Sequence, residues 1–316
     1  MKIDFHVHPH FKKYDARAVV DAMSARKVDI LGLAGYNKDT FDENRRIFDE
    51  LEERYGEKYS VENDNLIIKI KDKSINKKYS ILRVGEYNNK EGFHLLVFGN
   101  QKGIKEGSPI EENIEAALST DSFVVLDHPF IAQHCAEKRK GGIVDRTLSL
   151  LLDYADIDKK KEDFLFRVCE KYSGNIAIEW NGYPIPSLRN VIDKSLQPLR
   201  LLRIEEIRFE DINKKVESLE EKLRKGGKNC PLVADTDLHA HYKKDLLLIG
   251  TANIKTDIDV ESGSVLQKSL KEKIFFHDYE INKGYVPISH FIISYAFPVL
   301  LGNLSKTLKE RIRPRG

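Results

Sequence analysis

The chain has 316 residues, 41% of them hydrophobic and 32% charged, and its 52 basic and 50 acidic residues give a net charge of +2. This composition is typical of a soluble globular protein and excludes a disordered chain. The near-neutral charge argues against general nucleic-acid binding. The longest apolar run, residues 291–301, contains Pro298 and is too short to cross a bilayer, so we expect no membrane partner.

The cysteines indicate a reducing compartment. Cys135, Cys169 and Cys230 are odd in number, far apart and without CxxC spacing, which argues against a disulfide framework and against a zinc ribbon. The N-terminus turns directly into a polar strand, without the pattern of a signal peptide. We therefore expect a cytoplasmic protein.

The first predicted element is a strand over residues 2–7 with Ile3, Phe5 and Val7 on one face. Side chains two apart on a strand point the same way, so His6 and His8 project together. Two imidazoles in this arrangement can share a metal ion. An isolated His-x-His pair is also common on surfaces and in satisfied cores, so the rest of the chain must supply matching ligands.

Strands and helices then alternate, in the order typical of a parallel sheet buried on both faces. A helix over residues 16–27, capped by Asp15, leads into an apolar strand over residues 30–34. A second helix begins at Thr40, which forms a capping box with Glu43, and ends at Gly56.

The segment 59–99 breaks this alternation, because three predicted strands joined by polar turns make it locally antiparallel. The alternation returns afterwards, and a helical tail begins at about residue 276. No linker is long enough to divide the chain, so residues 1–316 are predicted to form one domain. The remaining predicted strands cover residues 122–126, 175–178, 231–234, 246–249 and 254–260, and helices are predicted near residues 110–118, within 143–172 and near 265–271.

Polar residues that can bind metal recur at the ends of successive predicted strands. Active sites of α/β barrels lie at the carboxyl rim of the strands, so this recurrence predicts a metal site there. Glu86 is the hardest to explain otherwise, because a carboxylate at the end of an apolar strand is costly to bury without a cation or donors. His128 alone could be a satisfied core histidine, and Glu179 is interpreted as an orienting or salt-bridged residue. The full set is His6, His8, Glu86, His94, His128, Glu179, Asp237 and His239.

These motifs resemble those of the PHP (polymerase and histidinol phosphatase) superfamily of metal-dependent phosphoesterases. The resemblance extends from residue 2 to about residue 275, and it implies an α/β fold, a distorted (β/α)7 TIM-like barrel of PHP type with an antiparallel insertion near residues 59–99. The motifs are Asp4-Phe5-His6-Val7-His8, Val84-Gly85-Glu86, His94-Leu95-Leu96, Asp127-His128-Pro129, Glu179-Trp180-Asn181 and Thr236-Asp237-Leu238-His239. Where the family usually has Ala-His-Pro, this chain has Asp127-His128-Pro129.

The resemblance also implies a set of metal sites. One site would use His6, His8, Glu86 and Asp237, and a second would use Glu86, His94 and His128, with Glu86 bridging. Gly35-Tyr36 stands where the family usually has Asp-His, so a third site keeps only His239, with His10 and Asp15 as candidate stand-ins. We therefore expect two or three divalent ions, Zn, Mn or Fe.

In function, the resemblance implies hydrolysis of a phosphate ester of a small metabolite or nucleotide by a metal-activated hydroxide. His239 and His134 are the candidate acids for the leaving group. The departure at Gly35-Tyr36 supports an alternative, a catalytically impaired barrel that serves as a binding or scaffold module. A hydrolase of amide or other C–N bonds is a third possibility, but such enzymes usually carry a ligating lysine in mid-chain and no apolar strand here ends in one. The sequence leaves the substrate and the oligomeric state open.

Overall fold

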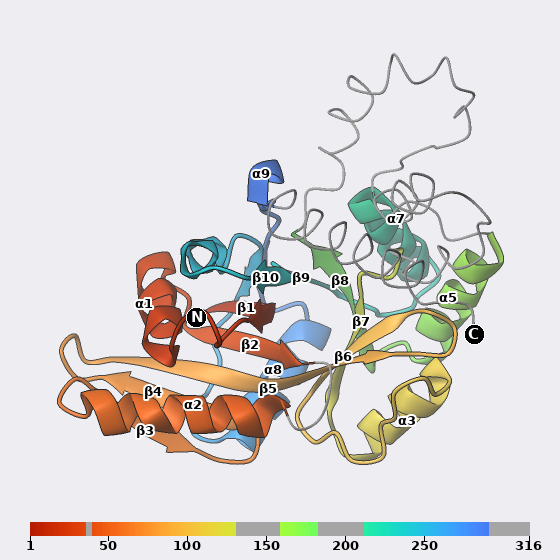
Figure 1. Ribbon diagram of the computed structural model, residues 1–316. Helices are drawn as coiled ribbons and strands as arrows, with labels where there is room; N and C mark the ends of the chain where they lie inside the picture. Colours follow the sequence, from red (N-terminus) through yellow and green to blue (C-terminus); the bar gives the residue numbers. More distant parts are fainter. Residues whose placement is uncertain (36–39, 131–158, 183–211, 291–316) are drawn as a thin grey trace, which may run out of the picture.

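The computed structural model describes residues 1–35, 40–130, 159–182 and 212–290 (Figure 1). Its centre is one twisted sheet in which seven strands follow one another side by side. In spatial order these are β1 (Lys2–Pro9), β2 (Ile30–Gly35), β5 (Lys77–Asn88), β6 (His94–Phe98), β7 (Phe123–Asp127), β8 (Ile176–Asn181) and β9 (Leu232–Asp235).

The sheet is mostly parallel and nearly closed. Neighbouring strands are parallel except β6, which runs antiparallel to both β5 and β7. Directly after β9, the short strand β10 (Leu238–Ala240) pairs in parallel with β1, so the end of the sheet returns to its beginning. The predicted α/β barrel-like fold is therefore confirmed.

The predicted antiparallel insertion is also confirmed. Strand β3 (Tyr59–Asn63) pairs antiparallel with β4 (Ile67–Asp72), which pairs antiparallel with the first half of β5. One face of this extension packs through Tyr59, Ile68 and Tyr79 into the apolar cluster that also holds residues of the helices α1 (Ala16–Arg26) and α2 (Thr40–Tyr55). The insertion therefore widens the sheet on the side that these two helices cover.

The remaining helices cover the outside and one end of the barrel. Figure 1 shows α3 (Ile110–Ser119), α5 (Lys159–Lys171) and α7 (Ile212–Lys225) grouped beside β6, β7 and β8, away from α1 and α2. Helix α8 (Gly263–Phe275) packs Leu266 and Leu270 into the cluster that contains Phe5, Phe98 and Phe123. An aromatic core therefore fills one end of the barrel and leaves the other end to polar side chains.

A bulge in β1 changes the face that its side chains occupy. The register between β1 and β2 shifts between Asp4 and Val7. Ile3 and Phe5 pack in the cluster that α8 covers, whereas Val7 packs with the residues of α1. The prediction that these three side chains share one face is therefore wrong for Val7, because the strand bends at the site, as bulges next to active sites often do.

Other predicted elements differ in type or length. Residues 246–249 are not a strand, because Lys243–Leu248 forms the 3-10 helix η4, in which the side chain of Asp245 accepts a hydrogen bond from the backbone of Tyr242. The apolar run imitates a strand although Leu247 is 55% exposed. The predicted strand 254–260 is only β11 (Asn253–Lys255).

The region after residue 276, predicted as a helical tail, begins with a short strand in the structure. Within the predicted helical tail, β12 (Glu280–Asn282) pairs antiparallel with β11, because the open edge of that strand offers it a partner. Only α9 (Ile288–His290) is helical in the described part of this tail. Residues 291–301, Cys135 and most of the predicted helices within 143–172 lie outside the described residues, so a single domain over 1–316 stays a prediction.

Within the described residues, Cys169 and Cys230 are buried and free. None of the helices in the described ranges is both long and apolar enough to traverse a lipid bilayer.

Asp4 fastens β1 to the segment after β9. Its buried carboxylate accepts hydrogen bonds from the amide and hydroxyl of Thr236 at 3.0 and 2.6 Å, and from the amide of Gly250 at 2.7 Å. We expect Asp4→Ala to lower the free energy of unfolding by about 3 kcal/mol, because it leaves these buried donors without an acceptor. Urea denaturation measures the change.

Asp15, a second aspartate near the N-terminus, serves as the control for this prediction. Asp15 caps α1, as predicted, through a hydrogen bond from the amide of Ala18. Asp15→Ala should cost only about 1 kcal/mol, the usual value for a helix cap. If Asp4→Ala and Asp15→Ala lower the free energy of unfolding by equal amounts, Asp4 does not hold the strands together.

Candidate metal centre

The predicted ligands converge at one end of the barrel, where the parallel strands have their carboxyl ends. His94 opens its strand rather than ending it, but it reaches the same rim because β6 is antiparallel and pairs His94 with Asp127. The structure therefore brings together residues from seven strands and the positions just after them, namely His6, His8, Glu86, His94, Asp127, His128, Glu179, Asp235, Asp237 and His239. Within this set only His239 is more than slightly exposed, with 18% of its side chain accessible.

The first group surrounds the imidazoles of β1. Nε2 of His6 lies 2.8 Å from Nε2 of His8. Oε2 of Glu86 lies 3.3 Å from the His8 nitrogen and 3.9 Å from the His6 nitrogen, and Oδ1 of Asp237 lies 3.6 and 3.8 Å from the His6 and His8 nitrogens. Ligands of one tetrahedral ion at ordinary bond lengths are about 3.4 Å apart, so these separations fit a shared metal.

The second group lies on the other side of Glu86. Its Oε1 is 2.6 Å from Nδ1 of His94, while Oε2 faces His8. The ring of His128 lies 4.7 Å from that of His94, and one ligand atom from each of Glu86, His94, Asp127 and His128 falls within 4.8 Å of the others. Glu86 thus touches both groups with different oxygens, as expected for a bridging carboxylate.

The third predicted site is sparser. His239 stacks on His8 with ring centres 4.5 Å apart, and its Nε2 is 3.5 Å from Oδ1 of Asp237. His10 turns to His241, with ring centres 5.0 Å apart, and joins none of the ligand groups among the described residues. Tyr36 and His134 lie outside the described residues.

Glu179 lies behind the ring of His6 and beside the backbone of His128. Its Oε1 lies 3.0 Å from Nδ1 of His6, and its Oε2 accepts hydrogen bonds from the backbone amide of His128 at 2.7 Å and from Asn181 at 3.2 Å. Burial raises the pKa of this carboxyl, but the hydrogen bond from His6 and the charge of that ring outweigh burial and lower the pKa to about 2. A carboxylate behind an imidazole in this way fixes which nitrogen faces the metal.

Two buried carboxylates were missed by the sequence reasoning. Asp127 and Asp235 are fully buried, and their side-chain oxygens form no hydrogen bond within the described part of the chain. Burial, reinforced by the negative charge of Glu179, raises the pKa of each. Their only sequence signal is position, since each ends an apolar strand directly before or within a ligand motif.

The backbone is strained at two ligand positions. His128 has φ of +25° and Asp237 has φ of +47°, in the left-handed region that residues other than glycine rarely adopt. Hydrogen bonds hold both: Glu179 binds the amide of His128, and Asn181 donates to Oδ2 of Asp237 at 2.9 Å. The strain therefore turns both side chains toward the centre.

The charges of the cluster fit a divalent metal. Burial and the neighbouring His239 lower the pKa of His8 to about 4, so its imidazole is neutral, as ligation requires. Burial raises the pKa of Glu86, but its close contacts with the imidazoles of His6, His8 and His94 outweigh burial and hold that pKa well below its ordinary value. Buried carboxylates without donors call for a cation, and imidazole and carboxylate ligands suit Zn, Mn and Fe.

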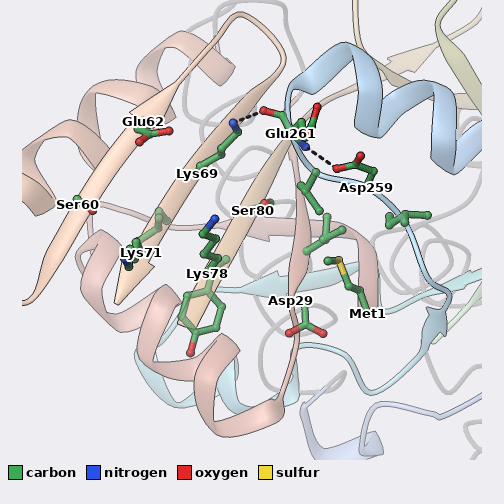
Figure 2. Close-up of a pocket in the computed structure, with 15 residues that line it drawn as sticks. Met1, Asp29, Ser60, Glu62, Lys69, Lys71, Lys78, Ser80, Asp259 and Glu261 are labelled. Atoms are coloured by element: carbon green, nitrogen blue, oxygen red, sulfur yellow. Dashed lines mark hydrogen bonds between the residues drawn. The ribbon is translucent and has the colours of Figure 1, made fainter. Parts of the chain in front are cut away.

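A cavity of about 510 Å³ lies elsewhere, at the opposite ends of β1, β2 and β5 (Figure 2). Lys69, Lys71 and Lys78 line it together with Glu62 and Glu261, so charges of both signs face it. None of the metal-centre residues lines this cavity. Since barrel active sites form at the carboxyl ends of the strands, the cavity is not the predicted site.

Comparison with known proteins gives distant likenesses in structure alone. No family model and no curated protein matches the chain. PsfC from Pseudomonas syringae PB-5123 is 13% identical with a TM-score of 0.45, over 95% of this chain and 98% of that one. The lesion-specific endonuclease PfuEndoQ from Pyrococcus furiosus is 12% identical with a TM-score of 0.40, over 89% of this chain and 57% of that one.

A third neighbour bears the name of the family that the motifs resemble. It is a two-domain protein from Bacteroides vulgatus containing a predicted PHP-like metal-dependent phosphoesterase, 10% identical with a TM-score of 0.44, over 90% of this chain and 65% of that one. Endonuclease Q is also known in complex with a 27-mer duplex substrate, while for this chain the absence of general nucleic-acid binding stays a prediction. This chain's own side chains form a buried cluster able to hold divalent metal.

Proposed function

We propose that this protein is a PHP-type metal-dependent phosphoesterase that cleaves a phosphate ester of a small metabolite or nucleotide. The observation that carries the proposal is Glu86, whose two oxygens face two separate histidine groups, with His94 on one side and His8 on the other. A carboxylate shared in this way is typical of two-metal hydrolases, in which both ions act on one phosphoryl group.

Two divalent ions bound in these groups would acidify a water molecule to serve as the nucleophile and would offset the negative charge that develops on the phosphoryl oxygens. The chain's own residues prepare this chemistry. Glu179 fixes the ring of His6 and the backbone of His128, so two ligands are oriented before a metal arrives. Asn181 does the same for Asp237.

His239 is the proposed acid for the leaving group. Its side chain lies at the rim and is 18% exposed, next to the buried ligands His8 and Asp237. A group that protonates a departing alcohol must reach both the substrate and a source of protons, and this position meets both requirements. His134, the other candidate acid, lies outside the described residues.

The purified protein is expected to contain about two equivalents of Mn, Zn or Fe and to hydrolyse p-nitrophenyl phosphate or bis(p-nitrophenyl) phosphate. Elemental analysis measures the metal, and release of nitrophenolate measures turnover. Protein stripped with a chelator should be inactive and should recover on addition of Mn²⁺. A preparation that binds no metal and stays inactive after reconstitution would contradict the proposal.

The alternative is a PHP-like barrel that binds a ligand or a partner without turning it over. Its motivation is Gly35-Tyr36, which stands where the resembled family usually has the Asp-His ligands of a third site. Such a protein would still bind metal through Glu86, so metal content alone cannot separate the two functions. Turnover that depends on Glu86 separates them.

A further inference from the structure

We propose that Asp127 is a fourth protein ligand of the second metal site, beside Glu86, His94 and His128. The inference rests on the proposed metal-dependent function and deepens it by adding a carboxylate to one of its sites. The resembled family usually has alanine at this position, so the resemblance gives Asp127 no role. The inference depends on the burial of Asp127, on its contacts with the neighbouring histidines and on the positions of its two carboxylate oxygens.

Asp127 is a carboxyl group placed where its ionised form needs a cation. It ends β7 in the interior with none of its surface exposed, and neither carboxylate oxygen accepts a hydrogen bond from the described residues. Asp4, equally buried, is surrounded by donors from Thr236 and Gly250. Because a buried carboxylate without donors is strongly unfavourable, Asp127 requires a partner of another kind.

The separations of the ligand atoms match one coordination shell. Oδ2 of Asp127 lies 3.2 Å from Nε2 of His128 and 3.7 Å from Nδ1 of His94. Neither contact is a hydrogen bond, and one ligand atom of each residue in this group lies within 4.8 Å of all the others. Two ligands of one tetrahedral ion are about 3.4 Å apart, so these distances fit edges of a single site.

Asp127 is not needed to orient His6, the nearest imidazole of the other group. Its Oδ1 lies 3.4 Å from Nδ1 of His6, but Oε1 of Glu179 is closer, at 3.0 Å, and forms the hydrogen bond. A neutral imidazole that binds metal through Nε2 has a single N–H to donate. Glu179 takes that hydrogen, which leaves both oxygens of Asp127 for the metal.

The added carboxylate changes the character of the second site. Two imidazoles and one shared carboxylate become two imidazoles and two carboxylates, from His94, His128, Glu86 and Asp127. Oxygen ligands favour harder ions, so the second site should take Mn²⁺ readily. Asp127 also reaches the first group, because its Oδ1 lies 3.4 Å from Nδ1 of His6.

The test measures how many Mn²⁺ ions each of three proteins binds, and with what affinity. The proteins are the wild type, Asp127→Asn and Asp72→Asn. Asp72 is a matched control, a buried aspartate on β4 that accepts a hydrogen bond from Ser74. Free Mn²⁺, followed by its electron paramagnetic resonance signal during titration of metal-free protein, gives the number of bound ions and their affinities. Wild type and Asp72→Asn should bind two ions, and Asp127→Asn should bind the second at least about tenfold more weakly.

Two outcomes overturn the inference and remain distinguishable. Wild type that binds no Mn²⁺ overturns the proposed function together with it. Equal binding of two ions by wild type and Asp127→Asn overturns the role of Asp127 alone. If Asp127→Asn does not fold, as judged by circular dichroism, a crystal structure of the Mn²⁺-loaded wild type decides: an Asp127 oxygen within about 2.2 Å of the second ion supports ligation, and clear separation excludes it.

Discussion

Glu86→Ala is expected to reduce phosphoesterase turnover on the order of 10³-fold and to lower the bound metal from about two equivalents to one or fewer. Glu86 is the residue that both ligand groups share, through Oε1 with His94 and Oε2 with His8. Removing it takes one ligand from each site and ends their connection. Metal ions contribute several kcal/mol to the stabilisation of such transition states, and about 4 kcal/mol corresponds to 10³-fold in rate.

The control is the same substitution at another glutamate, where it should change neither turnover nor metal content. Glu62 is exposed on β3, lines the cavity at the opposite end of the barrel and belongs to none of the ligand groups. Steady-state kinetics and elemental analysis of Glu62→Ala should match the wild type. If Glu86→Ala keeps full turnover with correct folding, the activity does not arise at this centre, and the binding or scaffold function becomes the better interpretation.

The sequence predicted the architecture well because the apolar patterns of the strands are strong and local. Some strands are buried along their whole length, such as Ile30–Gly35 and Phe123–Asp127. Continuous apolar runs in the sequence predict such strands. The antiparallel insertion was recognised from its turns. The 3-10 helix Lys243–Leu248 was not, because its leucines imitate a strand while Asp245 closes the turn with a hydrogen bond that periodicity does not reveal.

The candidate site shows a similar division. His6, His8, Glu86 and His128 could be found because polar residues that interrupt or end apolar runs stand out in the sequence. Asp127 could not be assigned a role, because an aspartate at a strand end reads equally well as a turn residue.

The proposed roles of these residues depend on the folded structure, because only the structure shows which carboxylate has a hydrogen-bond donor beside it. Glu179 receives hydrogen bonds from His6 and His128, whereas Asp127 and Asp235 receive none within the described residues. The bulge in β1 is likewise invisible in the sequence, since Ile3, Phe5 and Val7 alternate regularly although the strand does not.

The electrostatics of the centre distinguish Glu179 from the proposed ligands. Glu179 has donors of its own and a pKa lowered to about 2, so it stays ionised whether or not metal is present. Burial raises the pKa of Asp235, which lies with Glu179 beside Nδ1 of His6. Glu179 and Asp235 therefore lie on the Nδ1 side of the His6 ring, whereas His8 and Glu86 lie on its Nε2 side.

His239→Asn is expected to slow hydrolysis of alkyl phosphates by about 10²–10³-fold and of p-nitrophenyl phosphate by less than about tenfold. General acids contribute rate in this range when the leaving group is basic, and nitrophenolate departs readily without a proton. Asparagine keeps a polar side chain of similar reach but has no proton to give near neutral pH. Turnover numbers on a series of esters with graded leaving groups measure the difference.

The same variant separates the two roles that the geometry allows His239. A ligand role, through the group it forms with His8 and Asp237, would slow all esters equally and would lower the metal content. An acid role leaves the metal content unchanged and steepens the dependence of rate on the leaving group. His277→Asn, at a histidine outside every ligand group among the described residues, should change neither quantity. Because His239 is partly exposed beside a buried centre, we expect the leaving-group dependence to change and the metal content to stay.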